Sequence, residues 1–129
     1  MIYVETSVVL AQVLAEDRCP PAALWTATPI SSRLTEYEVW TRVHARGLGA
    51  SHGESVRLLL ARFGWLEMTP AVLARALEPW PILLRTLDAL HLASIEFLRS
   101  HHQDVTLASY DSRIIAGAQS LLIPLFPLQ

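Results

Sequence analysis

Residues 1–14 read MIYVETSVVLAQVL, and the order of elements in this stretch decides the fold class. Met1–Val4 is a short apolar segment with β-branched side chains, which predicts a strand. Ser7–Leu14 follows almost at once with the pattern of a helix. Glu5 stands at the joint between the two, where an unpaired carboxylate is costly to bury. The stretch therefore predicts a strand followed by a helix and marks Glu5 as the first candidate functional residue.

The remaining sequence repeats this alternation of strands and helices. Further strands are predicted at 28–33, at 65–69 (or a connector there), at 105–109 and at 121–126. Further helices are predicted at 35–47 and 51–64, which form a hairpin, and at 70–80, 86–100 and 110–121. Thr35 is the N-cap candidate of its helix, Gly47 marks its end, and Pro70 suits a first helical turn. Because Pro124 cannot donate to a ladder, the last strand is predicted at an edge of the sheet.

This alternation predicts an α/β fold. Strands joined by helices give right-handed crossovers, a mostly parallel sheet and helices on both of its faces. We therefore expect a single domain over residues 1–129, with three α/β/α layers around a central sheet of about 4–5 strands. In such a sheet ligands bind beyond the carboxyl ends of the strands, and Glu5 lies at such an end.

Composition narrows the classes of function. Hydrophobic residues make up 52% of the chain and charged residues 17%, so apolar surface must be buried internally or covered by a partner. The formal net charge of −2 gives no overall basic field for nucleic acid. All ten basic residues are Arg, which suits phosphate binding but is explained equally well by codon usage.

Composition also indicates where in the cell the protein is expected to be. No apolar run approaches the length that crosses a bilayer, and Met1–Leu14 lacks the basic flank of a signal peptide. The single cysteine, Cys19, has no partner for an internal disulfide, which fits a reducing compartment. We expect a soluble, cytoplasmic protein with no membrane partner.

Two predicted strands each deliver an acid and a nearby hydroxyl to one edge of the sheet. Glu5 is followed by Thr6 and Ser7, and Ser109 precedes Asp111 at the end of a predicted buried strand. The structural alternative for Asp111 is that it only caps the last helix, where an acid favours the helix dipole. Two such acids at one edge favour a functional site.

Two further acids lie near helix starts. Asp88 belongs to a first helical turn in which Thr86 is the candidate cap, and its neighbours are so apolar that the carboxylate needs a partner, for which a cation would serve. Glu38 lies one turn into its helix, where an ordinary surface pair with Arg42 is the alternative. Spacing alone does not separate Glu38 from Glu36.

These pieces resemble, in order and spacing, the PIN domain family, and especially the VapC-type ribonuclease toxins. The matching segments cover nearly the whole chain and are VETS (4–7), RLTEYEV (33–39), RTLDALHLA (85–93) and TLASYDSRI (106–114). The resemblance implies a PIN-like α/β/α fold and a metal-dependent endoribonuclease, the toxin of a toxin–antitoxin pair. It also implies single-stranded or looped RNA as substrate, a VapB-like antitoxin as partner and a homodimer.

By this resemblance the family's four acids fall on Glu5, Glu38, Asp88 and Asp111, and its supporting hydroxyls on Thr6 or Ser7 and on Ser109. Glu5, Asp88 and Asp111 would hold Mg²⁺ or Mn²⁺, directly or through water. Glu38 would complete the ring of acids and help to orient the attacking water. Four converging carboxylates repel one another without a cation, so an incoming basic side chain is the other way to compensate them.

One position departs from the family pattern, because the family's first acid is almost always Asp. Glu5 carries one more methylene, which moves the carboxylate by about 1 to 1.5 Å. Since Mg²⁺ requires near-octahedral geometry, this predicts weakened activity, a shift towards Mn²⁺, or loss of activity. The alternative function is a catalytically impaired PIN-like module that binds RNA or a protein. Phosphoryl transfer through an acyl phosphate is a weaker third interpretation, because Glu5 has no second acid beside it.

Other candidate side chains have simpler explanations. His91 lies three residues after Asp88 and so near the site, but a satisfied core histidine is the preferred interpretation. His101 and His102 end a helix, where cationic side chains suit the dipole, and no spaced Cys/His partner supports zinc. The four Trp side chains are assigned to core or interface packing.

Overall fold

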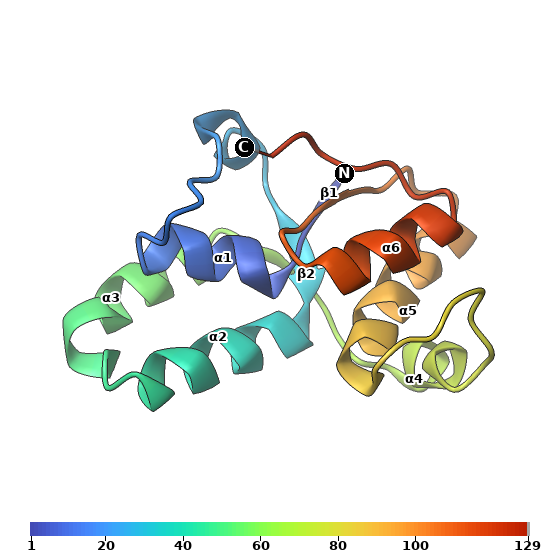
Figure 1. Cartoon of the computed structure of the whole chain (residues 1–129), viewed down its shortest axis with the longest axis horizontal. Coiled ribbons are helices and arrows are strands. Elements are labelled where there is room, and N and C mark those ends of the chain that lie inside the picture. Colours follow the sequence, from blue (N-terminus) through green and yellow to red (C-terminus); the bar gives the residue numbers. More distant parts are fainter. Residues whose placement is uncertain (129) are drawn as a thin grey trace.

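A computed structural model describes residues 1–128 and contains one sheet of four parallel strands in the order β3-β2-β1-β4 (Figure 1). The strands are β1 (Ile2–Val4), β2 (Ile30–Ser32), β3 (Gly64–Leu66) and β4 (Thr106–Ala108). The first strand of the sequence is therefore central, between β2 and β4. Its carboxyl end is held on the β4 side, where the Glu5 amide donates to the carbonyl of Ala108 at 3.0 Å.

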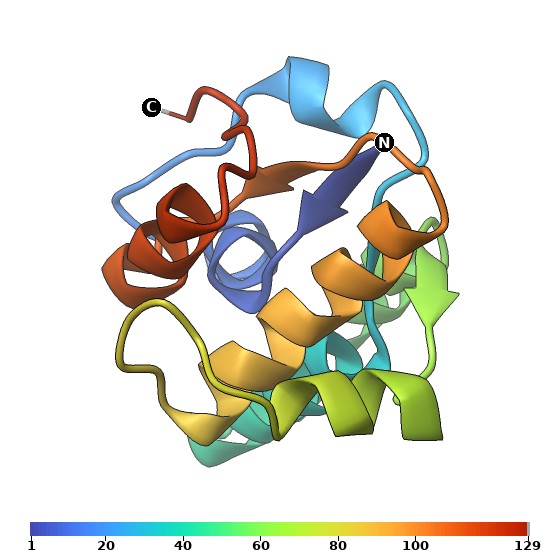
Figure 2. The same cartoon turned by 90° about the vertical axis from the view of Figure 1, so that its right-hand side faces the viewer.

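Helices cover both faces of this sheet (Figure 2), which confirms the predicted three-layer α/β/α architecture. One face packs on α1 (Thr6–Val13), α2 (Arg33–Ala45), α3 (Gly49–Leu60) and the short 3₁₀ helix η1 (Ala22–Trp25). The other face packs on α5 (Thr86–Ser100) and α6 (Ser112–Ser120), with α4 (Pro70–Ala76) lying along α5.

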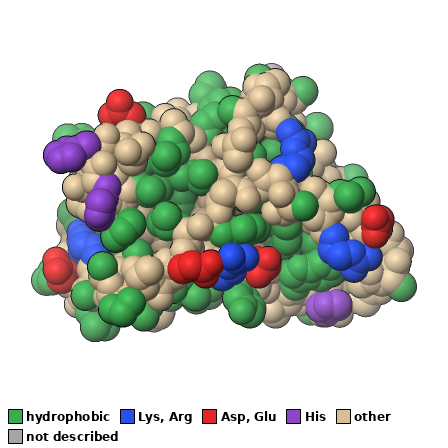
Figure 3. All heavy atoms as spheres, turned by 180° about the vertical axis from the view of Figure 1, so that it is seen from behind, with side chains coloured by type: hydrophobic (Ala, Val, Ile, Leu, Met, Phe, Trp, Pro, Cys, Tyr) green, Lys and Arg blue, Asp and Glu red, His purple; other side chains and the backbone are tan. Residues whose placement is uncertain are grey.

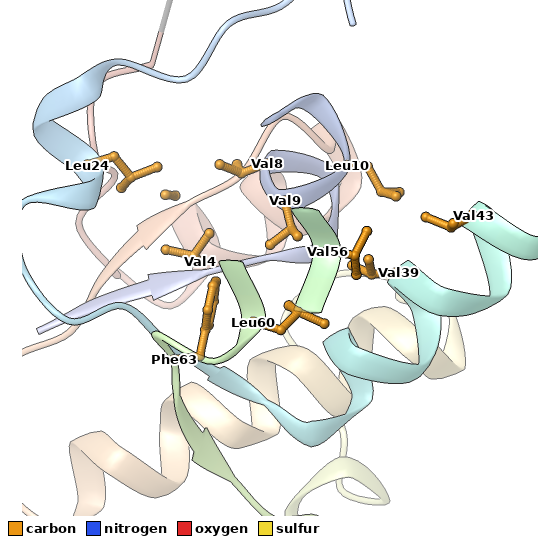
Figure 4. Close-up of a cluster of buried hydrophobic side chains, with 11 residues drawn as sticks. Val4, Val8, Val9, Leu10, Leu24, Val39, Val43, Val56, Leu60 and Phe63 are labelled. Carbon is orange, nitrogen blue, oxygen red and sulfur yellow. The ribbon is translucent and has the colours of Figure 1, made fainter. Parts of the chain in front are cut away.

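The sheet separates two hydrophobic cores because successive side chains of a strand point to opposite faces. Val4 of β1 packs with α1, α2 and α3, in a cluster that also takes in Val39 and Phe63 (Figure 4). Tyr3, its neighbour in sequence, points the other way and packs among residues of α5 and α6 such as Leu92 and Ile114. The polar hydroxyl of Tyr3 is thereby buried in the second core.

Every predicted helix is present, and α2 and α3 each begin two residues before their predicted starts. α2 begins at Arg33 and is capped by Ser32, whose hydroxyl accepts from the Leu34 amide at 3.1 Å. Thr35 was the predicted cap, but it is buried and its hydroxyl lies 2.7 Å from that of Ser31. β2 therefore runs into α2 without a loop, and the capping position falls three residues earlier.

α3 likewise begins early, whereas α5 begins at its predicted residue but without its predicted cap. α3 begins at Gly49 instead of residue 51. α5 is preceded by Arg85, which offers no side-chain cap, and Thr86 is already its first helical residue. Thr86 is therefore not the cap that the sequence predicts. Pro70 does occupy the first turn of α4, behind the cap Thr69.

The predicted last strand at 121–126 is reduced to a single parallel bridge between Leu107 and Leu125. The Leu107 amide donates to the Pro124 carbonyl at 2.9 Å, and the Phe126 amide donates to the Leu107 carbonyl at 2.8 Å. Pro124 and Pro127 have no amide hydrogen, so a longer ladder cannot form. The segment still covers the outer edge of β4.

The surface retains apolar side chains. Seen from behind, hydrophobic side chains form patches between small groups of charged ones (Figure 3). Leu77 and Leu83, which flank the turn between α4 and α5, are 89% and 99% exposed. Within residues 1–128, no helix has the length and apolar character needed to cross a membrane.

Candidate active site

Four acids lie at or near the carboxyl ends of the strands, and we call this set the acid edge: Glu5, Glu38, Asp88 and Asp111. Glu5 directly follows β1, and Asp111 follows β4 after a two-residue turn. Glu38 lies in α2, which starts where β2 ends, and Asp88 lies in the first turn of α5. The parallel sheet thus brings together residues that are more than 100 positions apart in the sequence.

The Glu5 carboxylate receives three hydrogen bonds. Oε2 accepts from the Ser7 amide at 3.1 Å, which makes Glu5 the N-cap of α1. Oε1 accepts from the Ser7 hydroxyl at 2.6 Å and from the Ser109 hydroxyl at 2.7 Å. The side chain is buried, so these donors replace the water that a carboxylate normally binds.

The two serines also link Glu5 to the turn after β4. Ser109 Oγ accepts from the Asp111 amide, and Ser7 Oγ accepts from the Tyr110 amide, both at 2.9 Å. Each hydroxyl therefore donates to Glu5 and accepts from a backbone amide of the turn after β4. This pairing fixes the start of α1 against the residues that lead to Asp111.

Burial raises the pKa of Glu5 above its ordinary value. The nearby His91 and the hydrogen bonds from Ser109 and Ser7 act in the opposite direction but only partly offset the burial. Glu5 therefore keeps its proton to a higher pH than an exposed glutamate.

The structure distinguishes Glu38 from Glu36, which the spacing in the sequence alone could not do. Glu38 Oε1 accepts from the Thr6 hydroxyl at 2.6 Å and lies 2.6 Å from His91 Nε2. Glu36 instead pairs with Arg33 at 3.4 Å. The alternative interpretation of Glu38, a surface pair with Arg42, is not among the ion pairs of residues 1–128, because Glu38 turns towards Thr6 and His91.

The pKa of Glu38 is lowered by this setting. Burial pushes it upward, but the hydrogen bonds from His91 and Thr6, with the electrostatic influence of His91 and Arg42, together outweigh the burial. Glu38 is thus a carboxylate over most of the accessible pH range.

Asp88 is 8% exposed, and its Oδ2 has no hydrogen-bond partner within residues 1–128. Burial raises its pKa and the charge of Asp111 adds to the rise, while a hydrogen bond from the Arg85 backbone, His91 and Arg113 oppose it. A buried carboxylate oxygen without a partner costs about 1–3 kcal/mol or more. Asp88 is the member of the acid edge whose charge the protein compensates least.

Asp111 caps α6, as the structural alternative predicted. Its Oδ1 accepts from the Arg113 amide at 2.8 Å and from the Ile114 amide at 3.3 Å. The cap uses only one oxygen of the carboxylate, and the charge is still felt at Asp88. Capping and a place in the acid edge are therefore compatible.

The donor chemistry of the acid edge fits a hard divalent cation, since every candidate ligand is a carboxylate oxygen. The unpartnered Asp88 Oδ2, next to the charge of Asp111, is the strongest sign of such a fit. In the side-chain positions described for residues 1–128, however, no three or more His, Cys, Asp or Glu residues are close enough together to hold an ion. The ligand set Glu5, Asp88 and Asp111 stays a prediction.

Sequence reasoning missed part of the support behind these acids. His91 is a satisfied core histidine, as preferred, but its second partner is an acid of the site. Tyr3 and Ser31 were not singled out, and Thr35 was considered only as a helix cap, although all three are fully buried polar residues. Tyr3 contacts His91, Thr35 contacts Thr6, and Ser31 contacts Thr35. Their signal is a polar side chain inside a strand or helix start that is otherwise apolar.

Comparison with known proteins identifies the family. A family model described as "PIN domain" matches residues 2–119. Ribonuclease VapC35 of Mycobacterium tuberculosis is 31% identical over 129 residues, and Ribonuclease VapC47 of the same organism is 27% identical over 128 residues. Each alignment covers 94% of this chain and 92% of the relative.

The fold comparison agrees. A chain of a toxin–antitoxin complex from Klebsiella pneumoniae superposes with a TM-score of 0.65 at 15% identity, covering 93% of this chain and 94% of that one. With a family match over residues 2–119 and a relative at 31% identity along nearly its whole length, this chain belongs to the PIN domain family.

Proposed function

We propose that this protein is a metal-dependent endoribonuclease, and that it is the VapC-type toxin of a toxin–antitoxin pair. The observation that carries the proposal is the buried Asp88 carboxylate, whose Oδ2 lacks a partner and whose pKa is raised by burial and by Asp111. Such a group at the carboxyl end of a parallel sheet is suited to binding a cation. The relatives named as VapC ribonucleases support the same chemistry.

In this proposal Asp88, Asp111 and Glu5 would hold Mg²⁺ or Mn²⁺, directly or through water. The bound ion would neutralise charge on the phosphate and lower the pKa of a water molecule. Glu38, held by Thr6 and His91, would accept a hydrogen bond from the attacking water. Ser7 and Ser109 would keep Glu5 in place, and Thr6 would keep Glu38 in place.

The proposed partners follow from the same charge balance. A VapB-like antitoxin would neutralise the toxin by bringing an Arg to the acid edge, where it would compensate Asp88 as a cation does. The exposed Leu77 and Leu83 support a protein interface, either in a homodimer or with the antitoxin. Both the enzyme and its RNA substrate would be cytoplasmic.

The test is cleavage of a mixed panel of structured and single-stranded RNAs with Mg²⁺ or Mn²⁺, after removal of any bound antitoxin. We expect the protein to cleave, Asp88→Ala to abolish cleavage, and Glu36→Gln to cleave as the unchanged protein does. Glu36 is the matched control because it is an acid of α2 that pairs with Arg33 outside the acid edge. Equal cleavage by Asp88→Ala would contradict the proposal.

A second function, a catalytically impaired module that binds RNA or a protein, is favoured by one observation. Glu5 is a glutamate whose two oxygens already accept three hydrogen bonds and whose pKa is raised by burial, and both properties weaken it as a metal ligand. Adding Glu5→Asp to the same RNA assay separates the two functions. Cleavage by Glu5→Asp alone would identify a nuclease scaffold made inactive by one methylene, and tight binding without cleavage by any variant would identify the module.

A further inference from the structure

A line of buried polar side chains runs behind Glu38. Tyr3 of β1 and His91 of α5 are 0% and 1% exposed. The Tyr3 hydroxyl lies 2.7 Å from His91 Nδ1, and His91 Nε2 lies 2.6 Å from Glu38 Oε1. Each ring nitrogen of the imidazole thus has one partner, and the line ends on an acid of the site.

The protons along this line can be assigned from its two ends. Glu38 has a lowered pKa, so it is a carboxylate and only accepts, which requires a proton on His91 Nε2. Burial strongly raises the pKa of Tyr3, so Tyr3 remains a phenol. Its oxygen accepts from the Ser32 amide at 3.2 Å, and its own proton is satisfied by donation to His91 Nδ1. The line therefore runs from Tyr3 O–H to Nδ1 and from Nε2–H to Glu38.

The restraint imposed by this line falls on one atom of Glu38. Oε1 accepts from both His91 and Thr6, which uses its two lone pairs and ties α2 to α5 and α1. Within residues 1–128, neither of these hydrogen bonds involves Oε2, and the Glu38 side chain is 25% exposed. One oxygen is thus held inside, and the other is left for a ligand.

Glu36 shows what an acid of the same helix looks like without this support. Its side chain is 33% exposed and its only ion pair within residues 1–128 is with Arg33, at 3.4 Å. An exposed pair of this kind fixes a side chain weakly. Glu38 instead has Oε1 held by two short hydrogen bonds, one of them from the buried His91, and such a network restricts the orientation of the carboxylate.

We propose that His91 is a positioning residue for the cleavage reaction: oriented by Tyr3, it fixes Glu38 by Oε1 and so presents Oε2 to the attacking water. This inference rests on the proposed ribonuclease function and assigns a new residue to the same site. His91 touches neither RNA nor water in this role, because it is buried and acts only through Glu38.

The first test is a double-mutant cycle on RNA cleavage with His91→Leu, Glu38→Gln and the combination. We expect His91→Leu to lower kcat by about 10- to 100-fold with KM unchanged, because such supporting partners act on the chemical step. In the Glu38→Gln background the same change is expected to cost nothing further. Independent, multiplying losses would overturn the proposal, since His91 would then act by another route.

The second test uses conservative replacements that each keep a nitrogen near the position of only one of the two ring nitrogens. In His91→Gln the amide nitrogen comes near the position of Nε2 and can donate to Glu38, whereas in His91→Asn it comes near Nδ1 and cannot reach. We expect Gln to restore most of kcat and Asn to behave like Leu, with thermal unfolding showing that all are folded. Equal rates for Gln and Asn would overturn the proposal.

The third test needs neither a variant nor activity. Nitrogen-15 NMR of the imidazole in the unchanged protein distinguishes a protonated from an unprotonated ring nitrogen. We expect His91 to carry its proton on Nε2, with Nδ1 unprotonated, and Tyr3→Phe to perturb the Nδ1 signal. A proton on Nδ1 alone would overturn the assignment, because Nε2 could not then donate to Glu38.

These tests separate this inference from the function on which it rests. If the unchanged protein cleaves no RNA but the imidazole has the expected tautomer, the ribonuclease function fails while the geometry of the line stands. If it cleaves RNA and His91→Leu retains full kcat, the positioning role fails while the ribonuclease function stands.

Discussion

The acid edge has two halves, Glu5 with Glu38 and Asp88 with Asp111, and the protein compensates their negative charges differently. Glu5 and Glu38 accept three and two hydrogen bonds, from donors on α1, α5 and the turn after β4. Asp111 accepts only from the backbone of its own helix, and Asp88 has an oxygen with no partner within residues 1–128. The protein thus supplies hydrogen-bond donors from several elements to Glu5 and Glu38, and leaves the charges of Asp88 and Asp111 to be compensated by a ligand. Ligand binding is therefore expected to be governed by Asp88 and Asp111, and the shape of the site by Glu5 and Glu38.

The largest effect should come from Asp88→Asn, which is expected to lower the rate of RNA cleavage on the order of 10³-fold. The same change should raise the free energy of unfolding by about 1 kcal/mol, because it removes a buried, poorly compensated charge beside Asp111. Cleavage assays and thermal unfolding in a chelator measure the two quantities.

Glu38→Gln is the comparison for this prediction, since the Glu38 carboxylate, unlike that of Asp88, accepts hydrogen bonds from His91 and Thr6. We expect it to lower both activity and stability. Stability changes of the same sign in Asp88→Asn and Glu38→Gln would break the distinction between the two halves.

Divalent cations should stabilise the protein through Asp88 and Asp111. At a free concentration of about 100 times Kd, Mg²⁺ or Mn²⁺ is expected to add about 2.7 kcal/mol to the free energy of unfolding. Asp88→Asn should abolish this gain and Glu36→Gln should keep it, as judged by thermal unfolding across a metal titration. An undiminished gain in Asp88→Asn would place the cation elsewhere.

Ser109→Ala probes the half that is rich in donors. It removes the 2.7 Å hydrogen bond to Glu5 and the acceptor of the Asp111 amide, and it is expected to cost about 1–3 kcal/mol of stability. Ser100→Ala is the control, because among residues 1–128 that exposed hydroxyl bonds only to the Phe97 carbonyl and to His101. Denaturant unfolding compares the two, and equal losses would show that the Glu5 hydrogen bonds contribute little.

The smallest expected effect is a difference in pH dependence between the unchanged protein and Glu5→Gln. Burial raises the folded-state pKa of Glu5, so the folded protein keeps this proton after the unfolded chain has released it. The stability contributed by Glu5 is therefore full below the ordinary glutamate range and is lost as pH rises through the raised value. Unfolding free energies measured across that window should fall faster with pH for the unchanged protein, and parallel curves would contradict the prediction.

The fold was largely predictable because its signals are local. Apolar runs punctuated by Pro and Gly marked each strand and helix, and their alternation implied a parallel sheet. The start of α2 was misplaced because two polar residues compete there for the capping position. Ser32 caps the helix, while Thr35 is drawn into a buried contact with Ser31. That choice depends on tertiary packing and has no local signal.

The acids and the supporting hydroxyls of Thr6, Ser7 and Ser109 could be named from the sequence and the family resemblance. Which acid each hydroxyl contacts could not be predicted. Strand ends and helix starts pointed to Glu5 and Asp111, whereas the Ser109 hydroxyl reaches Glu5 across 104 residues and Tyr3 reaches His91 across 88. Which side of α2 faces the site depends on how the helix is rotated against the sheet. Spacing alone leaves Glu38 and Glu36 open and the resemblance selects Glu38, which the structure turns towards His91 while Glu36 pairs with Arg33.

The central place of β1 has a consequence for how the protein is made. β4, a neighbour of β1 in the sheet, is synthesised about 100 residues after it, and Ser109 and Asp111 follow β4. A nascent chain that has not reached Ser109 and Asp111 lacks one hydroxyl donor to Glu5 and one of the four acids. If the protein is a toxic nuclease, the acid edge therefore stays incomplete until the chain has been synthesised past β4 and Asp111.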